Sequence, residues 1–274
     1  MIDWIQGEKF QKIANYTFAP RVLEGHDYLH FGNTLNLDLL KDGDIIYVQG
    51  FIGYMQKLLS VIKDTKKVII VSNNCDHCVD SSFVMPDNVI RWYARNVNVD
   101  DPRIESIPSG LENNHWRPEM KKKEKIIDKL QEERKIKNLV YMDHAISWNV
   151  TERSMLYEIF SGVTWMTRVK NKSVSYETYI DNVYNHKFAI CPAGNGMSTH
   201  RPWEALYLGT IPIQRLDLDS RFYTDLPICF VESWKQINEK FLNKEYERIR
   251  SISTWKMEML TFEYWKNKIL NTPY

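Results

Sequence analysis

The residues best suited to chemistry lie between positions 187 and 214, where the chain reads KFAICPAGNGMSTHRPWEALYLGTIPIQ. The pattern predicts a buried strand, a glycine turn, a helix, a glycine stop and a second buried strand. We expect the turn to hold Gly194, Asn195 and Gly196. This order places the turn at the carboxyl end of a strand, where open α/β sheets bind ligands.

The start of the helix after this turn is suited to holding a phosphate. A helix N-terminus presents unpaired backbone N–H groups and the positive end of the helix dipole. Arg201 adds a forked cation, and Glu204, one turn on, can accept hydrogen bonds from sugar hydroxyls. We expect the helix to open with Ser198, Thr199, His200 and Arg201.

Simpler interpretations of these residues remain open. Many G-x-G turns are only tight connections, and Arg201 and Glu204 at i,i+3 spacing can form a surface ion pair worth about 0.3 kcal/mol. The dinucleotide fingerprint G-x-G-x-x-G is not met, because residue 199 is Thr. The sequence therefore disfavours an NAD-dependent dehydrogenase.

The composition limits the classes of partner. The 274 residues include 36 basic and 35 acidic side chains, and this balance argues against a general nucleic-acid or membrane-surface binder. The 9 Trp and 15 Tyr residues suit stacking on sugar faces, although most are expected in the core. No apolar run approaches the roughly 18 residues that span a bilayer, and the N-terminus does not resemble a signal peptide. We expect a soluble cytoplasmic protein whose four cysteines are reduced.

Short β-branched runs alternate with helical patterns, which is typical of parallel sheets covered by helices. The expected strands of the first half are 12–18, 44–48, 67–72, 89–94 and 103–108. Those of the second half are 139–143, 164–168, 188–191, 210–214 and 228–231. Helices are expected at 54–62, 121–135, 151–160, 176–185 and 199–208.

These elements predict an α/β protein with two Rossmann-like domains that face a cleft. The tail from 233 to 270 is expected to be helical and to return to the N-terminal domain. Four of its apolar residues fall on one stripe at helical spacing: Trp255, Met259, Phe262 and Ile269. The expected boundaries are 1–115 for the N-terminal domain, 116–232 for the C-terminal domain and 233–274 for the terminal helices.

The pattern C-P-x-G-x-G-x-S-x-x-R-x-x-E-A-x-x-x-G-x-I-P, which begins at Cys191, resembles the donor-site motif of exostosin-like glycosyltransferases. Upstream, the I-P-S-G-L-E segment at 107–112 resembles the end of the N-terminal domain in small soluble bacterial or viral members. Asn74-Cys-Asp76 resembles an N-x-D element of the same group, and 92–96 (WYARN) also looks similar. The resemblance implies the GT-B type of fold and an inverting, metal-independent transfer of a sugar from a nucleotide sugar to a hydroxyl of a glycan or glycoprotein.

The resemblance also implies roles for individual residues of the C-terminal, donor-binding domain. Glu204 is expected to bind the ribose hydroxyls of the donor. Arg201, and the N–H groups from Asn195 to Ser198, are expected to hold the diphosphate, and His200 lies beside them. Arg153 resembles a basic residue that faces the same diphosphate, although it can equally be an ordinary solvated arginine.

Inverting transfer needs a base that takes the proton of the acceptor hydroxyl. Asp76 is our candidate, because it follows a strand end in the N-terminal, acceptor-binding domain. Its rivals on the acceptor side are His26, Asp27, His77 and Asp80. For each of the rivals, a capping or solvated loop role is the simpler interpretation.

Two patterns that can indicate metal binding are interpreted otherwise. Cys75-x-x-Cys78 has no second Cys or His pair at zinc-finger spacing, and Asp217-Leu-Asp219 follows a buried strand in a turn-like setting. We expect no metal and no other cofactor, since cations and helix dipoles stabilise the leaving diphosphate in enzymes of this type.

The donor and the activity itself have alternatives. We favour a UDP-sugar such as UDP-xylose, UDP-galactose or UDP-glucuronate. A GDP-fucose-dependent fucosyltransferase is the alternative enzyme, and Ala205 counts against it because a lysine is expected at that place. A non-catalytic protein that binds a nucleotide or a glycan is the alternative from another class. One departure from the exostosin-like pattern is Ala193, where a basic residue often follows C-P.

Overall fold

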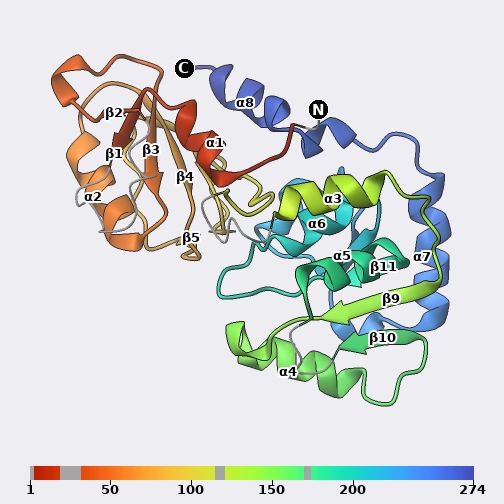
Figure 1. Cartoon of the computed structure of the whole chain (residues 1–274). Helices are drawn as coiled ribbons and strands as arrows, with labels where there is room; N and C mark the ends of the chain where they lie inside the picture. Colours follow the sequence, from red (N-terminus) through yellow and green to blue (C-terminus); the bar gives the residue numbers. More distant parts are fainter. Residues whose placement is uncertain (1–2, 19–31, 115–120, 170–173) are drawn as a thin grey trace. The chain divides into compact units, whose positions relative to one another are not determined.

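The computed structural model describes residues 3–18, 32–114, 121–169 and 174–274 (Figure 1). The chain forms two compact units. The first comprises Met1–His115, Gly196–Ser198 and Thr261–Tyr274, and the second comprises Trp116–Asn195 and Thr199–Leu260. Each unit is built on its own parallel sheet with helices, which confirms the predicted α/β fold with two Rossmann-like domains.

The first unit contains a parallel six-stranded sheet in the order β2-β1-β3-β4-β6-β8. Its central strands read as almost continuous apolar runs, because both faces of a parallel sheet are covered. Helix α2 contacts β3, and α1 contacts β3 and β4. The strands are β1 (Tyr16–Phe18), β2 (Asn33–Thr34), β3 (Asp44–Gln49), β4 (Val68–Asn73), β6 (Val89–Ala94) and β8 (Ile104–Ser106). The helices are α1 (Gly7–Lys12) and α2 (Ile52–Ile62), and a separate pair is formed by β5 (Val79–Asp80) and β7 (Val97–Asn98).

The start of the first unit differs from the prediction. The strand expected at 12–18 is the three-residue β1. Lys12 is instead the last residue of helix α1, and residues 13–15 connect this helix to β1, so only the end of the expected strand is extended.

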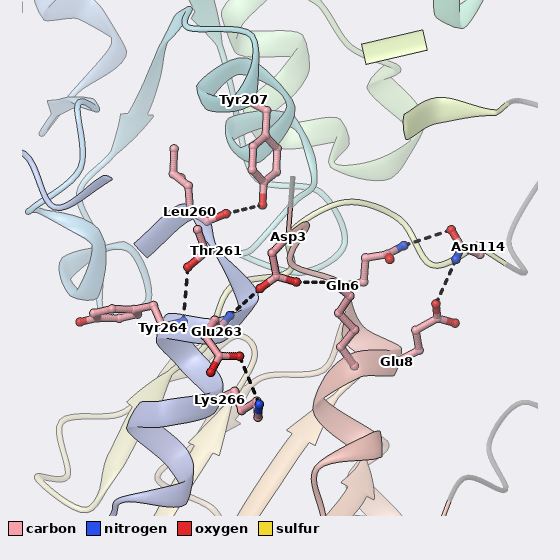
Figure 2. Close-up of polar contacts among 11 residues, drawn as sticks. Asp3, Gln6, Glu8, Asn114, Tyr207, Leu260, Thr261, Glu263, Tyr264 and Lys266 are labelled. Carbon is pink, nitrogen blue, oxygen red and sulfur yellow. Dashed lines mark hydrogen bonds and ion pairs between the residues drawn. The ribbon is translucent and has the colours of Figure 1, made fainter. Parts of the chain in front are cut away.

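The C-terminal segment returns to the first unit, as the fold prediction required. Thr261 caps helix α8 (Phe262–Leu270) by accepting a hydrogen bond from the Tyr264 N–H, at 3.3 Å. Asp3 then joins the two ends of the chain, because its carboxylate accepts from the Glu263 N–H at 2.7 Å (Figure 2). Trp265 and Ile269 of α8 are fully buried, which anchors the helix.

The second unit contains a parallel five-stranded sheet in the order β10-β9-β11-β12-β13. Its strands are β9 (Asn138–Asp143), β10 (Met166–Val169), β11 (His186–Ile190), β12 (Ile211–Arg215) and β13 (Cys229–Val231). Its helices are α3 (Lys122–Leu130), α4 (Val150–Ile159), α5 (Tyr176–Tyr184), α6 (Arg201–Tyr207) and α7 (Glu239–Ser251). Residues from the five strands, from α4 and from α7 form one hydrophobic core.

The predicted helical tail is interrupted. Helix α7 ends at Ser251, a 3-10 turn covers Met257–Leu260, and α8 begins at Phe262. Trp255 therefore lies between helices, where it packs against the core of the second unit. The expected single stripe is thus wrong, because its members belong to different elements and to both units.

Candidate functional site

The polar residues of the second unit gather where the strand order of its sheet reverses. From β9 the chain moves to β10 on one side and then to β11 on the other. The carboxyl ends of β9 and β11 therefore border the switch point of a doubly wound sheet, the usual ligand position in such folds. The segments that leave these ends are 144–149 and 191–200.

Arg153 joins these two segments. It lies in the first turn of α4, whose N-terminus is capped by the Asn149 side chain at 3.2 Å from the Glu152 N–H. Its Nε donates to the Ala193 carbonyl and its Nη1 to the Ala145 carbonyl, each at 2.8 Å. Arg153 is only 5% exposed, so it is not a solvated surface arginine.

Arg201 is the second cation of the site, at the first position of α6. Its guanidinium lies over the Tyr179 ring, 4.8 Å from the ring centroid. Within the described residues it makes no hydrogen bond or ion pair. Burial lowers the pKa of Arg201, but electrostatic interactions with Tyr179, Asp143 and Glu204 outweigh burial and leave that pKa raised. The guanidinium is therefore a permanent cation whose N–H groups are unused by the described part of the fold.

The two arginines act on each other electrostatically. Burial, and then the charge of Arg201, lower the pKa of Arg153 to about 10. Such a lowered pKa means that keeping Arg153 protonated costs free energy when no anion is bound. An anion placed between the guanidinium groups would remove this cost, which makes the switch point a candidate phosphate site.

His144 lies at the same place, directly after β9. It is 2% exposed, and its Nδ1 is buried with no hydrogen-bond partner in the described structure. Its Nε2 lies 3.4 Å from the Arg153 carbonyl oxygen. Burial, followed by the charge of Arg201, lowers the pKa of His144 to about 3, so the imidazole is neutral at pH 7.

Glu204 is held by two tyrosines of α5. Its Oε1 accepts from the Tyr176 hydroxyl and its Oε2 from the Tyr179 hydroxyl, both at 3.0 Å. Glu204 is 4% exposed and forms no ion pair with Arg201. The surface ion pair considered for these two residues is therefore not formed. Both carboxylate oxygens already have a partner within the fold, and the ribose-binding role of Glu204 stays a prediction.

The predicted phosphate-binding turn is only partly as expected. Helix α6 begins at Arg201, so Ser198, Thr199 and His200 precede it rather than open it. The Ser198 N–H donates to the Asn96 side chain at 2.7 Å, and the Ser198 hydroxyl bonds the Ser109 hydroxyl at 3.0 Å. Both contacts lie within the first unit, to which 196–198 belong. The Ser198 N–H already donates to Asn96, so it is not one of the donors that were expected to bind a phosphate.

The glycines of this turn differ in their surroundings. A Cβ on Gly196 would lie 2.8 Å from the Asn96 amide, so only glycine fits there. Gly194 is half-buried and Asn195 is exposed, and both belong to the second unit. Their role in holding a diphosphate stays a prediction.

Asp76, the predicted base, lies in the loop after β4. Its carboxylate is 3.6 Å from the Arg95 guanidinium, and the side chain is 51% exposed. Arg95 also donates to the Ser198 carbonyl at 2.9 Å, so the ion pair is part of a larger polar group in the first unit. An exposed carboxylate can accept a proton from a ligand, and the role of Asp76 stays a prediction.

The rivals of Asp76 fall into three cases. Asp80 accepts from the N–H and hydroxyl of Ser82, and these hydrogen bonds lower the pKa of Asp80, as expected of a turn-forming residue. His77 is exposed, and its Nδ1 lies 2.9 Å from the Cys75 sulfur. The remaining acceptor-side candidates, His26 and Asp27, lie outside the described residues.

The structure shows the surroundings of the two sequence patterns that can indicate metal binding, Cys75-x-x-Cys78 and Asp217-Leu-Asp219. Burial raises the pKa of the Cys75 thiol, which disfavours the thiolate that a metal ligand or nucleophile needs. Asp217 accepts from the N–H groups of Asp219 and Ser220, which forms a local turn. In the described parts of the chain no group of three or more His, Cys, Asp or Glu side chains is placed to hold a metal ion.

Sequence reasoning missed three residues of this site. His144 was not among the residues predicted for the site, although its position directly after a buried strand is a signal for a ligand-facing residue in an α/β fold. Tyr176 and Tyr179 carried no such signal, because their contact with Glu204 depends on how α5 packs.

Comparisons with known proteins add little. No protein-family model matches the sequence, and no curated protein matches it. A crystal structure of an alpha1,3-fucosyltransferase is similar over 89% of this chain and 73% of that one, at 13% identity and a TM-score of 0.39. A structure of an alpha1,3-fucosyltransferase with GDP-fucose is similar over 84% of this chain and 82% of that one, at 10% identity and a TM-score of 0.33. Because these scores are low, the fold assignment rests on the two sheets themselves.

Over the residues that the structure describes, no helix combines the length and the apolar character that a bilayer crossing needs.

Proposed function

We propose that this protein is an inverting, metal-independent glycosyltransferase that uses a nucleotide-sugar donor, with a UDP-sugar favoured. The diphosphate of the donor binds at the switch point of the second unit, between Arg201 and Arg153. The acceptor is a hydroxyl of a glycan or glycoprotein. The motif that begins at Cys191 supports this proposal from the sequence, and the two arginines support it from the structure.

A single observation carries the proposal: Arg201 is half-buried, and its guanidinium has no hydrogen-bonded partner among the described residues. Charges that are partly withdrawn from water are normally paired, because leaving them unpaired costs free energy. A diphosphate would accept hydrogen bonds from Arg201 and lie in the field of Arg153. Cations fixed in this way also stabilise the negative charge that grows on the leaving diphosphate, which is the main requirement of glycosyl transfer from a nucleotide.

The neutral state of His144 fits the same role. A third positive charge would repel the two guanidinium groups, whereas a neutral imidazole can donate or accept one hydrogen bond through the unpartnered Nδ1. His144 is therefore suited to bond a phosphate or ribose oxygen.

Isothermal titration with UDP, GDP and NAD tests the donor site. We expect a nucleoside diphosphate to bind, and Arg201→Gln to weaken its binding about 10- to 100-fold, the equivalent of one charged hydrogen bond at about 1.5–3 kcal/mol. Arg248→Gln is the matched control, because Arg248 lies in the same unit but pairs with Glu245 on the exposed surface. Equal binding by Arg201→Gln and wild type would refute the site.

The same titrations separate the alternatives. Preference for GDP over UDP supports the fucosyltransferase, and NAD binding without UDP binding supports the dehydrogenase. Asp76→Asn then distinguishes an enzyme from a binding protein. If Asp76 is the base, this variant keeps donor binding and loses sugar transfer, which is measured as release of the free nucleoside diphosphate in the presence of acceptor.

A further inference from the structure

The sheet of the first unit has a switch point of its own. From β1 the chain moves to β2 on one side and to β3 on the other. Gln49 is the last residue of β3, so it lies at the carboxyl edge where the order reverses. Open sheets place ligands at this edge, and the donor site proposed above uses only the corresponding edge of the second unit.

Two buried amide side chains lie together at this edge. Gln49 and Asn73, the last residues of β3 and β4, are register partners, so their side chains leave the sheet on the same face of neighbouring strands. Gln49 is 7% exposed and Asn73 is 2% exposed. Gln49 Oε1 and Asn73 Nδ2 are buried with no hydrogen-bond partner among the described residues.

These atoms differ from the rest of their surroundings, which are well satisfied. Asn73 Oδ1 accepts from the Asn74 N–H at 2.6 Å, and the Asn74 side chain donates to the Tyr47 hydroxyl at 2.9 Å. Buried amides in folded proteins are nearly always paired. One acceptor and one donor left open on adjacent strands therefore require an explanation.

An aromatic residue follows Gln49 closely in the chain. Phe51 follows Gln49 after one residue and is half-buried, with its ring centroid 5.7 Å from that of Tyr54 and 5.9 Å from that of His77. The loops after β3 and β4 approach closely here, since a Cβ on Gly50 would lie 3.1 Å from the Cys75 Cβ. A ring beside neutral amides is the combination that binds sugars, because the ring packs on the C–H face and the amides bond hydroxyls.

We propose that Gln49, Asn73 and Phe51 form a binding site for a neutral sugar, which is the acceptor of the transferase proposed above. A sugar hydroxyl donates to Gln49 Oε1 and accepts from Asn73 Nδ2, so one hydroxyl satisfies both open atoms. The amides carry no charge, which favours an uncharged sugar over a phosphate. The Gln49 side chain makes no hydrogen bond to the described residues, so binding a ligand would break no such bond.

Saturation-transfer NMR with methyl glycosides of galactose, glucose, xylose and N-acetylglucosamine tests this site in the full chain. We expect at least one glycoside to bind, and Gln49→Leu to weaken it by about tenfold or more, the equivalent of one lost hydrogen bond. Gln56→Leu is the matched control, because Gln56 is an exposed glutamine of the neighbouring helix α2. We expect this control to bind as the wild type does.

Thermal unfolding of the same variants distinguishes a binding residue from a structural one. Gln49→Leu removes an amide that has no partner, so its unfolding midpoint should equal or exceed that of the wild type. A structural glutamine would lower the midpoint. If Gln49→Leu does not fold, Gln49→Met, which keeps an unbranched side chain of similar length, takes its place.

The outcomes are separable from those of the donor site. No binding of any of the four glycosides, or equal binding by wild type and the Gln49 variant, would overturn the sugar site. Glycoside binding that depends on Gln49 in a protein that binds no nucleotide would keep the sugar site and reject the proposed transferase.

Discussion

Acid should destabilise this protein through His144, and the effect can be isolated with one substitution. His144 is buried beside two guanidinium groups, and its pKa of about 3 lies far below the ordinary 6.5 that it regains on unfolding. The unfolded chain therefore binds a proton at His144 that the folded chain excludes. A group of this kind contributes stability above its unfolded pKa, and the contribution is lost as the pH falls towards the folded pKa.

The size of the effect follows from the two pKa values. Between pH 7 and pH 5, linkage lowers the free energy of unfolding by about 2 kcal/mol, and by pH 3 the loss reaches about 4 kcal/mol. His186 is also buried and its pKa is also lowered by burial, so it adds to the acid sensitivity of the wild type.

Urea unfolding at pH 7 and pH 5 measures the effect in the wild type and in His144→Gln. Glutamine keeps a hydrogen-bonding side chain but does not titrate, and His186 is present in both proteins. We expect the variant to lose about 2 kcal/mol less than the wild type over this pH range. Equal losses in the two proteins would refute the argument that His144 is held neutral by burial and by Arg201.

Two further predictions concern stability. Gly110→Ala should lower the free energy of unfolding by more than about 2 kcal/mol, because φ is +58° and the added Cβ would lie 2.2 Å from the Ile5 carbonyl oxygen. Gly162→Ala is the control, since φ there is +75° but no atom lies within 4 Å of the added Cβ. In the same urea assay it should lower the free energy of unfolding by only about 1 kcal/mol. Arg134→Lys should lower the free energy of unfolding by about 2–4 kcal/mol, because Arg134 donates to the carbonyls of three residues and to the hydroxyl of a fourth, and a lysine cannot reach them all. A decrease below about 0.5 kcal/mol would contradict this role. The partners of Arg134 are Tyr184, His186, Gly209 and Thr210.

The sequence predicted the architecture because parallel sheets leave a strong signal. Runs such as DIIYVQ and VIIVSN are buried on both faces, so they are apolar along most of their length, with polar residues at their ends. The position of Arg201 near the start of a helix was predicted for the same reason, because the sequence marks both the end of β11 and the beginning of the next helix. Short elements leave a weaker signal, and β1, which starts at Tyr16, was predicted to start already at Lys12.

The partners within the site could not be predicted from the sequence. Glu204 meets tyrosines that precede it by 28 and 25 residues, and no periodicity encodes a contact between two helices. Ser198 was expected to offer its N–H to a phosphate, but that N–H is taken by Asn96, which precedes it by 102 residues. Such contacts are set by packing, whereas the sequence reports mainly which residues are buried.

The two proposed sites follow from one physical argument applied to each unit separately. A buried polar atom without a partner opposes folding, so a fold that keeps one must be compensated elsewhere. Gln49 and Asn73 end strands of the first sheet, and His144 follows a strand of the second. All three lie at the carboxyl ends of strands in parallel sheets, which is the edge where such sheets bind ligands. If these atoms were errors of packing, apolar replacements would stabilise the protein without loss of any ligand. If they are binding groups, the same replacements raise stability and abolish binding, so the two measurements must be made on the same variants.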